Sequence, residues 1–328
     1  MKHTEKTYRS VRWNRNNIHF MNMPKKMQIL LFTSLVLAFS SCDRDEVFEK
    51  EQYKNVFALI SGTGNVSSKY HSLGGETVGY ISASLGGTTP TTKDINVTLV
   101  EDSYFIDEYN RINFDVDKTK YVLPLPKENY SIDSYGFTIP AGKVSGRLPV
   151  RIRPDGLSPD RKYAFALRVE SYSAYEVNPE RSYIIYNVEI KNRWAEGGGK
   201  TTYNMNAKLS EIGATYELQM PGTKVVQPIS NNQVRILAGN EKEISKFAVL
   251  LTMDDENKVT ISSYKNVEVT QRDNDSYYSN IFFIEDDGFN TYKTFRLKYE
   301  YKSGNKTYEV REELRLQFNQ DEENEEGL

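Results

Sequence analysis

The chain has 328 residues, a formal net charge of −3, 38% hydrophobic and 27% charged residues, and a single cysteine. The hydrophobic fraction excludes an intrinsically disordered chain, and the lone cysteine excludes a disulfide scaffold and a cysteine-rich zinc module. The slightly acidic balance argues against nucleic acid as the main partner, because phosphate binding needs a basic surface.

The N-terminal segment, residues 1–41, has the pattern of a leader. Two lysines precede an apolar run over residues 29–39, and two serines follow the run, directly before Cys42. The run is shorter than the ~20 apolar residues of a membrane-spanning helix and fits the apolar region of a secretory signal. The arrangement resembles a bacterial lipobox, whose cysteine carries a lipid anchor. The alternative interpretation is a buried core cysteine after an accidental apolar run.

An acidic segment follows this cysteine within the expected lipidated tether, residues 42–52. Its acids are Asp43, Asp45 and Glu46. They resemble the surface-export signal of Bacteroidetes lipoproteins, and the alternative is an ordinary solvated tether. With the anchor, this resemblance predicts a protein held in the outer membrane by lipid and facing the cell exterior.

Strand signals dominate the next segment, residues 53–193. Short alternating runs of β-branched and aromatic residues, such as 94–100, 163–169 and 183–190, are separated by turn residues. Helical periodicity is scarce, and its best candidate is residues 102–113, which we expect to cross one end of a sandwich. The pattern predicts a β-sandwich domain.

A glycine-rich linker, residues 194–200, is expected next, because three consecutive glycines lose much backbone freedom on ordering. Alternation resumes in a C-terminal β domain, residues 201–319, and an acidic tail, residues 320–328, ends the chain. The fold class is therefore all-β: an N-terminal β-sandwich, which the family resemblance described below implies to be Ig-like, followed by a second antiparallel β-sandwich or small barrel.

Two hairpins are predicted in this second domain. One spans residues 247–261, and a longer one spans residues 295–318 with one apolar and one polar face. Glu312 falls on the apolar face of the longer hairpin. Since a carboxylate is costly in a core, we expect a bulge or a strand end there.

Residues 93–191 resemble a Bacteroidetes domain of unknown function found at the N-terminus of many outer-membrane lipoproteins. The resemblance is carried, in order, by the strand at 96–100, Asp107-Glu108-Tyr109-Asn110, Tyr121, Leu123-Pro124, Asn129-Tyr130, Ile139-Pro140-Ala141-Gly142, Ser145-Gly146, Pro149-Val150, Leu157, Tyr163 and Leu167. The second half is similar to a β-rich domain often paired with this one. The resemblance implies Ig-like sandwiches encoded near polysaccharide-utilisation (Sus-like) loci, and a role in glycan acquisition or adhesion. It transfers no binding residues.

Catalytic and cofactor chemistry has little support in the residues. His71, the one histidine after the predicted leader, lies in a segment that we expect to be a surface loop, and no nucleotide-binding motif is present. We expect no metal and no cofactor. Two adjacent acid pairs, Asp254-Asp255 and Asp286-Asp287, could in principle serve glycoside hydrolysis, but their context predicts turns. An enzyme is therefore not expected.

Carbohydrate binding needs flat rings that stack on sugar faces. Five aromatic residues in polar segments or beside the linker are candidates: Tyr172, Tyr175, Trp194, Tyr277 and Tyr278. The alternatives are loop anchoring for the tyrosines and packing between domains for Trp194. The favoured hypothesis is a non-catalytic surface lipoprotein that binds polysaccharide or supports a glycan-uptake complex with outer-membrane protein partners. A surface adhesin or structural protein-binding lipoprotein is the alternative, and a glycoside hydrolase is less favoured.

Overall fold

The computed structural model describes residues 56–86 and 90–319. Cys42, Asp43, Asp45 and Glu46 lie outside these residues, as do the predicted leader and the acidic tail. Strands make up most of the described chain, so the all-β prediction is confirmed. Within the described ranges, no helix is long and apolar enough to cross a membrane.

The N-terminal part of the described chain forms two sheets. Its strands are β1 (Val56–Leu59), β2 (Val66–Ser72), β3 (Thr77–Gly86), β4 (Ile95–Glu101), β5 (Leu123–Pro124), β6 (Tyr130–Ser131), β7 (Gly136–Ile139), β8 (Ser145–Ile152), β9 (Tyr163–Tyr172), β10 (Glu176–Val177) and β11 (Tyr183–Lys191). One sheet has the order β10-β1-β3-β8-β6. The other has the order β2-β11-β9-β4-β7, and β5 pairs with β9.

These two sheets share one apolar core. Alternate residues of each strand point inward, such as Phe165 and Leu167 of β9 and Leu148 and Val150 of β8, and all four are buried. Most pairings are antiparallel, but β2 runs parallel to β11, β1 to β10 and β5 to β9. The arrangement is a sandwich of two mixed sheets.

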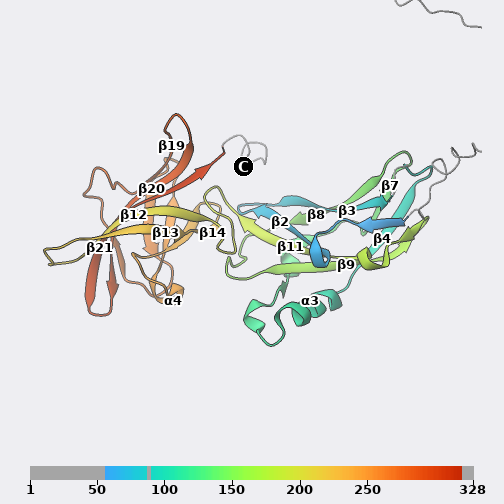
Figure 1. Cartoon of the computed structure of the whole chain (residues 1–328), viewed down its shortest axis with the longest axis horizontal. Helices are drawn as coiled ribbons and strands as arrows, with labels where there is room; N and C mark the ends of the chain where they lie inside the picture. Colours follow the sequence, from blue (N-terminus) through green and yellow to red (C-terminus); the bar gives the residue numbers. More distant parts are fainter. Residues whose placement is uncertain (1–55, 87–89, 320–328) are drawn as a thin grey trace, which may run out of the picture. The chain divides into compact units, whose positions relative to one another are not determined.

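The predicted helix exists as α3 (Tyr104–Phe114), but its predicted position at one end of the sandwich is wrong. Ile106 of α3 packs with Ala164, Ala166 and Ile185, which project from the outer faces of β9 and β11. Figure 1 shows α3 lying alongside these strands. The small alanines leave room for a helix on a sheet face that would otherwise be wet.

His71 is a second correction. It lies in β2 and is 2% exposed, so the prediction of a surface loop is wrong. Its Nδ1 lies 2.7 Å from Thr77 Oγ1 and its Nε2 lies 3.1 Å from Tyr186 Oη. Burial, with the charge of Lys191, lowers the pKa of His71 to about 4, so the ring is neutral at pH 7. Its ring partners are a threonine and a tyrosine, so it forms no Ser-His-Asp triad.

The C-terminal part also forms two sheets. Its strands are β12 (Thr202–Glu211), β13 (Leu218–Val225), β14 (Gln227–Ser230), β15 (Gln233–Leu237), β16 (Ala248–Met253), β17 (Val259–Ser263), β18 (Val269–Gln271), β19 (Ile281–Asp286), β20 (Thr291–Ser303) and β21 (Lys306–Phe318). One sheet has the order β13-β12-β21-β20-β18, with β19 also on β20, and the other has the order β14-β15-β16-β17. A short helix, α4 (Ile244–Phe247), precedes β16. Both sheets contribute to one buried core, which makes this part a sandwich too.

Both predicted hairpins are confirmed. Strand β16 pairs with β17, and β20 pairs with β21 in unbroken register from Thr291 opposite Phe318 to Ser303 opposite Lys306. The expectation of a bulge or strand end at Glu312 is wrong, since Glu312 sits mid-strand opposite Leu297 and Ala207.

An internal charge pair explains this regular register. Glu312 is fully buried and forms an ion pair with Lys224 of β13, which is also buried. The Tyr299 hydroxyl donates a further hydrogen bond to Glu312 Oε1 at 3.0 Å. A carboxylate can occupy a core position when it is paired and hydrogen-bonded in this way.

The glycine-rich segment, residues 194–200, forms an ordered turn attached to the end of β11. The Gly197 N–H donates to the Ile190 carbonyl at 2.8 Å, and Gly198 donates to the Pro159 carbonyl at 3.2 Å. Gly198 and Gly199 both have φ of 70°, a backbone region that favours glycine.

Candidate functional site

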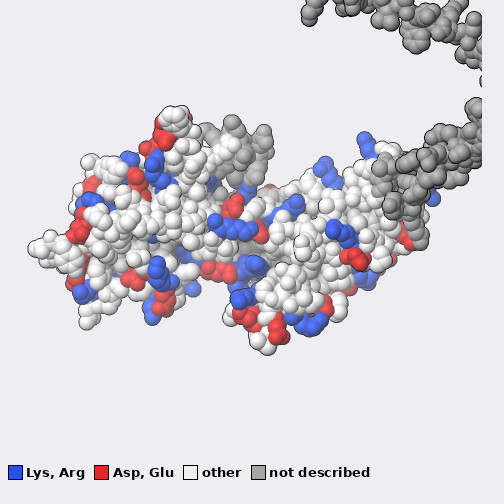
Figure 2. Space-filling model, viewed as in Figure 1, with Lys and Arg blue, Asp and Glu red and all other residues white. Residues whose placement is uncertain are grey.

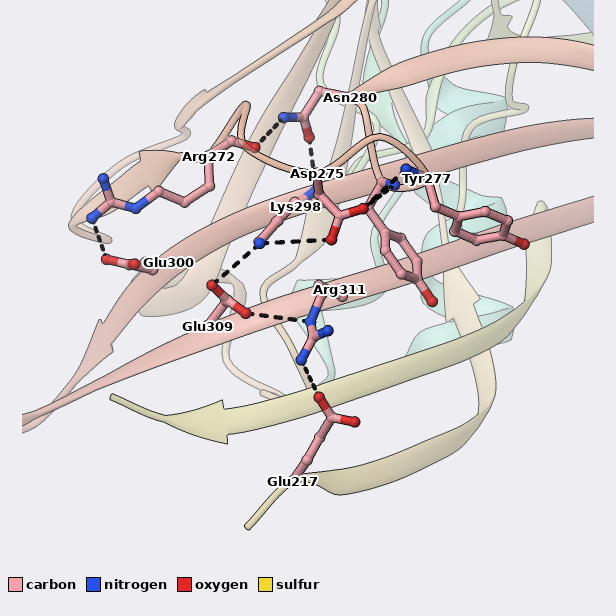
Figure 3. A network of polar contacts seen from close by, with 10 residues as sticks. Glu217, Arg272, Asp275, Tyr277, Asn280, Lys298, Glu300, Glu309 and Arg311 are labelled. Atoms are coloured by element: carbon pink, nitrogen blue, oxygen red, sulfur yellow. Dashed lines mark hydrogen bonds and ion pairs between the residues drawn. The ribbon is translucent and has the colours of Figure 1, made fainter. Parts of the chain in front are cut away.

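The loop between β18 and β19, residues 273–280, presents Tyr277 and Tyr278 together. Asp275 Oδ1 accepts the backbone N–H groups of Tyr277 at 2.9 Å and Tyr278 at 3.0 Å, which sets the turn. Asn280, 2% exposed, fixes the loop's end to the sheet. Its Nδ2 donates to the Arg272 carbonyl at 2.8 Å, and its Oδ1 accepts the Lys298 N–H at 2.7 Å (Figure 3).

Charged side chains support this loop from the sheet below it. Lys298 Nζ lies 3.7 Å from Asp275 Oδ2 and 3.6 Å from Glu309 Oε2. Arg311 extends the network to Glu217, which lies directly before β13 (Figure 3). Because the lysine is nearly buried, these ion pairs are less screened by water than surface pairs. The network therefore holds the loop at a defined place on the sheet.

Tyr277 lies at the surface with one hydrogen bond and one stacked cation. Its side chain is 49% exposed, and its hydroxyl donates to Glu313 Oε2 at 2.7 Å. The guanidinium carbon of Arg296 lies 4.1 Å from the ring centre, and the Tyr278 ring meets Tyr277 edge-on at 4.9 Å. These contacts fix the orientation of a ring that remains half open to solvent.

The same pattern repeats along the outer face of β19, β20 and β21. Arg296 also lies 4.8 Å from the Phe283 ring centre, and Arg315 lies 4.0 Å from that of Tyr292. Arg315 Nη2 is 3.1 Å from Glu285 Oε2, and Arg296 Nε donates to Glu313 Oε2 at 2.7 Å. We call this surface the Tyr277 face; it consists of Tyr277, Phe283, Glu285, Tyr292, Arg296, Glu313 and Arg315.

Two carboxylates beside Tyr277 are held in the charged form, Glu313 of the Tyr277 face and Asp275 of the loop. Burial alone would raise the pKa of Glu313, but hydrogen bonds from Arg296 and Tyr277 outweigh it, so this pKa lies below its usual range. The pKa of Asp275 is also lowered, chiefly by the backbone hydrogen bond from Tyr278. The charged carboxylate accepts hydrogen bonds from hydroxyls. A glycosidase acid needs the opposite shift, a raised pKa.

The other tyrosine candidates lie in the N-terminal sandwich, Tyr172 in β9 and Tyr175 in the turn between β9 and β10. Tyr172 ends β9, is 42% exposed, and meets Phe57 edge-on at 5.4 Å. Tyr175 packs against the core with its hydroxyl 3.5 Å from Thr91 Oγ1. The structure thus brings Tyr277 and Tyr278 together, while Tyr172 and Tyr175 belong to a different sandwich.

Trp194 lies in the core of the C-terminal sandwich. It is 6% exposed, and its ring meets Phe282 edge-on at 5.9 Å. The Tyr203 hydroxyl donates to the Trp194 carbonyl at 2.9 Å. This burial places the indole outside any exposed platform.

The two acid pairs serve as turn residues. Asp254 Oδ1 accepts the N–H groups of Glu256 and Lys258 at 2.9 and 2.8 Å. Asp287 Oδ1 accepts the N–H groups of Phe289 and Asn290 at 3.0 and 2.8 Å. Within the residues that the structure describes, no cluster of three or more His, Cys, Asp or Glu side chains has the arrangement of a metal site.

Sequence reasoning missed the arginines and the neighbouring rings of the Tyr277 face. Alternation placed Arg296 on the polar face of the terminal hairpin, and this placement is correct. The missing information was tertiary, because nothing in the local pattern says that the loop at 273–280 folds back over β20. Phe283 and Tyr292 stand next to buried residues, so the local pattern alone indicates ordinary strand residues.

Two family models match consecutive parts of the sequence. A family model of an N-terminal domain matches residues 48–176, and a model of a C-terminal domain matches residues 182–315. The two matches follow each other along the chain in the order that their descriptions give, N-terminal before C-terminal. No curated protein matches the sequence.

Solved structures from Bacteroides share the fold. A multidomain protein of Bacteroides ovatus that includes a domain of unknown function (DUF1735) has a TM-score of 0.58 at 14% identity, covering 81% of this chain and 95% of that one. A second B. ovatus protein, of unknown function, has a TM-score of 0.55 at 16% identity, with 83% and 93% covered. An auxiliary nutrient binding protein of Bacteroides thetaiotaomicron has a TM-score of 0.53 at 15% identity, with 78% and 92% covered. At 14–16% identity, these neighbours show that the two-sandwich fold of this chain is shared with proteins of Bacteroides.

Proposed function

We propose that this protein binds carbohydrate at the cell surface through the Tyr277 face and does not transform it. The main support for this proposal is the half-exposed Tyr277 ring, which contacts Arg296 and Tyr278 and lies beside an ionised Glu313. A fixed ring offers a stacking surface at little conformational cost, and the neighbouring carboxylate and guanidinium groups can hold sugar hydroxyls.

Two further findings support a binding role. One protein that shares this fold is described as an auxiliary nutrient binding protein. On the face drawn in Figure 2, lysine and arginine side chains are interspersed with acidic ones, and this distribution differs from the continuous basic surface of nucleic-acid-binding proteins. The lowered pKa of Glu313 favours hydrogen-bond acceptance over general-acid catalysis.

The test is affinity electrophoresis of the purified protein through gels that contain host or dietary polysaccharides. We expect retention by at least one polysaccharide and about tenfold weaker binding by Y277A, equivalent to ~1.4 kcal/mol. Y104A is the matched control, because Tyr104 is also an exposed tyrosine, 60% exposed, with an aromatic edge contact to Phe105 at 5.5 Å.

Two results would contradict the proposal. One is the absence of retention in every gel, and the other is equal retention of Y277A and the parent protein. Mild-detergent copurification of a constant protein partner, together with no glycan binding, would favour the adhesin alternative.

The proposed location rests on the N-terminal sequence. Cys42 would carry the lipid, and Asp43, Asp45 and Glu46 would direct export to the outer face of the outer membrane, where the protein could serve a glycan-uptake complex. Labelling with a palmitate analogue should mark the parent chain and not C42A. Protease added to intact cells should degrade the parent and spare a D43N/D45N/E46Q variant. An unlabelled parent would overturn the anchor, and a protected parent would overturn the outward location.

A further inference from the structure

A small cavity opens on the N-terminal sandwich, in a different domain from the Tyr277 face. Its volume is about 160 Å³, and it lies between the end of β11, the segment leading into β9 and the glycine turn. Its lining includes Pro159, Arg161, Tyr163, Asn187, Gly197 and Lys200. One water occupies ~30 Å³ of liquid, and drug-sized ligands fill ~300–1,000 Å³. The cavity therefore suits one small molecule, or one terminal unit of a longer one.

Asn187 gives the cavity a buried hydrogen-bond acceptor. Its side chain is 7% exposed, and its Nδ2 donates to Ser68 Oγ at 3.0 Å and to Glu189 Oε1 at 3.2 Å. These donations fix the amide orientation, since Glu189 can only accept. Asn187 Oδ1 is left without a hydrogen-bond partner. A buried acceptor without a donor is costly. Since Oδ1 is itself buried, a hydroxyl of an occupant reaches it when the Asn187 side chain turns toward the cavity.

The charged groups around the cavity favour an anionic occupant. Lys200 is already engaged by Glu189 and by the Tyr70 hydroxyl, which lies 2.8 Å from Nζ. Arg161 and Lys162 also line the cavity, are exposed, and have no ion pair with any described residue. The carboxylate of Glu189 is therefore neutralised locally, and two further cations remain at the rim.

We propose that this cavity binds a hydroxylated carboxylic acid of monosaccharide size, such as a uronic acid. A sugar hydroxyl would donate to Asn187 Oδ1, and the carboxylate would face Arg161 and Lys162. Pro159 and Tyr163 offer apolar surface for the C–H faces of the ring. The site would be separate from the Tyr277 face, so the two binding functions can be tested independently.

The experiment is calorimetric titration of the purified full chain with glucuronic acid, methyl β-glucuronide and glucose. We expect both uronates to bind at least tenfold more tightly than glucose. R161Q/K162Q changes two exposed side chains without altering the core, and it should weaken uronate binding about tenfold. N187L should weaken it further, and Y104A, at an exposed tyrosine outside both proposed sites, should leave it unchanged.

The titrations with glucuronic acid and with its methyl glycoside distinguish a free sugar acid from the end of a longer chain. Binding of free glucuronic acid alone would identify a free sugar acid, whereas binding of the methyl glycoside would identify a chain end. Equal binding of glucose and glucuronic acid, no binding of either uronate, or unchanged uronate affinity in R161Q/K162Q would overturn the proposal and leave a water-filled cavity. Uronate binding that Y277A abolishes and R161Q/K162Q leaves intact would overturn the location.

Discussion

The buried ion pair of Lys224 and Glu312 allows a direct test of how the C-terminal core tolerates charge. The substitution E312Q keeps the size of the side chain and an oxygen that can accept the Tyr299 hydroxyl. It removes the negative charge and leaves Lys224, whose side chain is 5% exposed, without its counter-ion. Breaking a buried pair by removing one partner costs about 3–5 kcal/mol, so we expect the free energy of unfolding of this sandwich to fall by that amount.

The double variant K224M/E312Q should recover most of this loss. It removes both charges and replaces the lysine with an apolar side chain of similar length. We expect its free energy of unfolding to lie within about 2 kcal/mol of the parent, because replacing a whole buried pair is often neutral. The strong non-additivity, and not the single loss, is the expected signature of the pair.

Urea denaturation followed by tryptophan fluorescence provides the assay. Trp194 lies in the same core as the ion pair, and W13F removes the other tryptophan of the chain. The reasoning is refuted if E312Q unfolds within about 1 kcal/mol of the parent. It is also refuted if the double variant is as unstable as the sum of E312Q and K224M.

Three further predictions concern the pH response, a crowded glycine and the binding loop. The pKa of His71 is about 4 in the folded protein and 6.5 in the unfolded chain, so the neutral ring contributes its full stabilisation above pH 6.5. As the pH falls towards 4, the unfolded chain takes up the proton first, and the free energy of unfolding drops by about 3 kcal/mol. Urea titrations at pH 7 and pH 4 should show a smaller drop in H71Q. G146A should destabilise by about 1–3 kcal/mol in thermal unfolding, because its Cβ would lie 2.3 Å from the Thr138 carbonyl oxygen, whereas G75A, with open space, should be neutral. D275A should weaken glycan retention as Y277A does, since it removes the acceptor of two loop N–H groups, and unchanged retention would show that the turn is held by other contacts.

Local pattern was sufficient for the elements that are defined by alternation. Phe295, Leu297, Tyr299 and Tyr301 are all buried, as the period of two predicts for one face of a hairpin. Helix α3 was found from its apolar positions, because a helix needs only local hydrogen bonds. Its place on the sheet was not found, since the alanines of β9 that receive it do not differ in pattern from core alanines.

The errors at His71 and Glu312 share one physical cause, which is a polar residue with a distant partner. The polar neighbours of His71 predict a loop, but its ring lies in the core and contacts the hydroxyl of Tyr186, 115 residues away. Glu312 was expected to break a strand, yet Lys224, 88 residues away, neutralises it. The prediction of the candidate site is incomplete for the same reason: it includes Tyr277 but not its distant partners Arg296 and Glu313.

The parallel pairing of β2 with β11 has a consequence for how the protein is made. Seven consecutive residues of β2, Val66 to Ser72, find their partners only in Ile185 to Lys191. The first sandwich therefore cannot close until synthesis or translocation has delivered nearly its whole length, and such non-local closure is slow. During that interval the nascent chain would expose unpaired strand edges, so its safe assembly depends on keeping it extended or chaperoned until the last strand arrives.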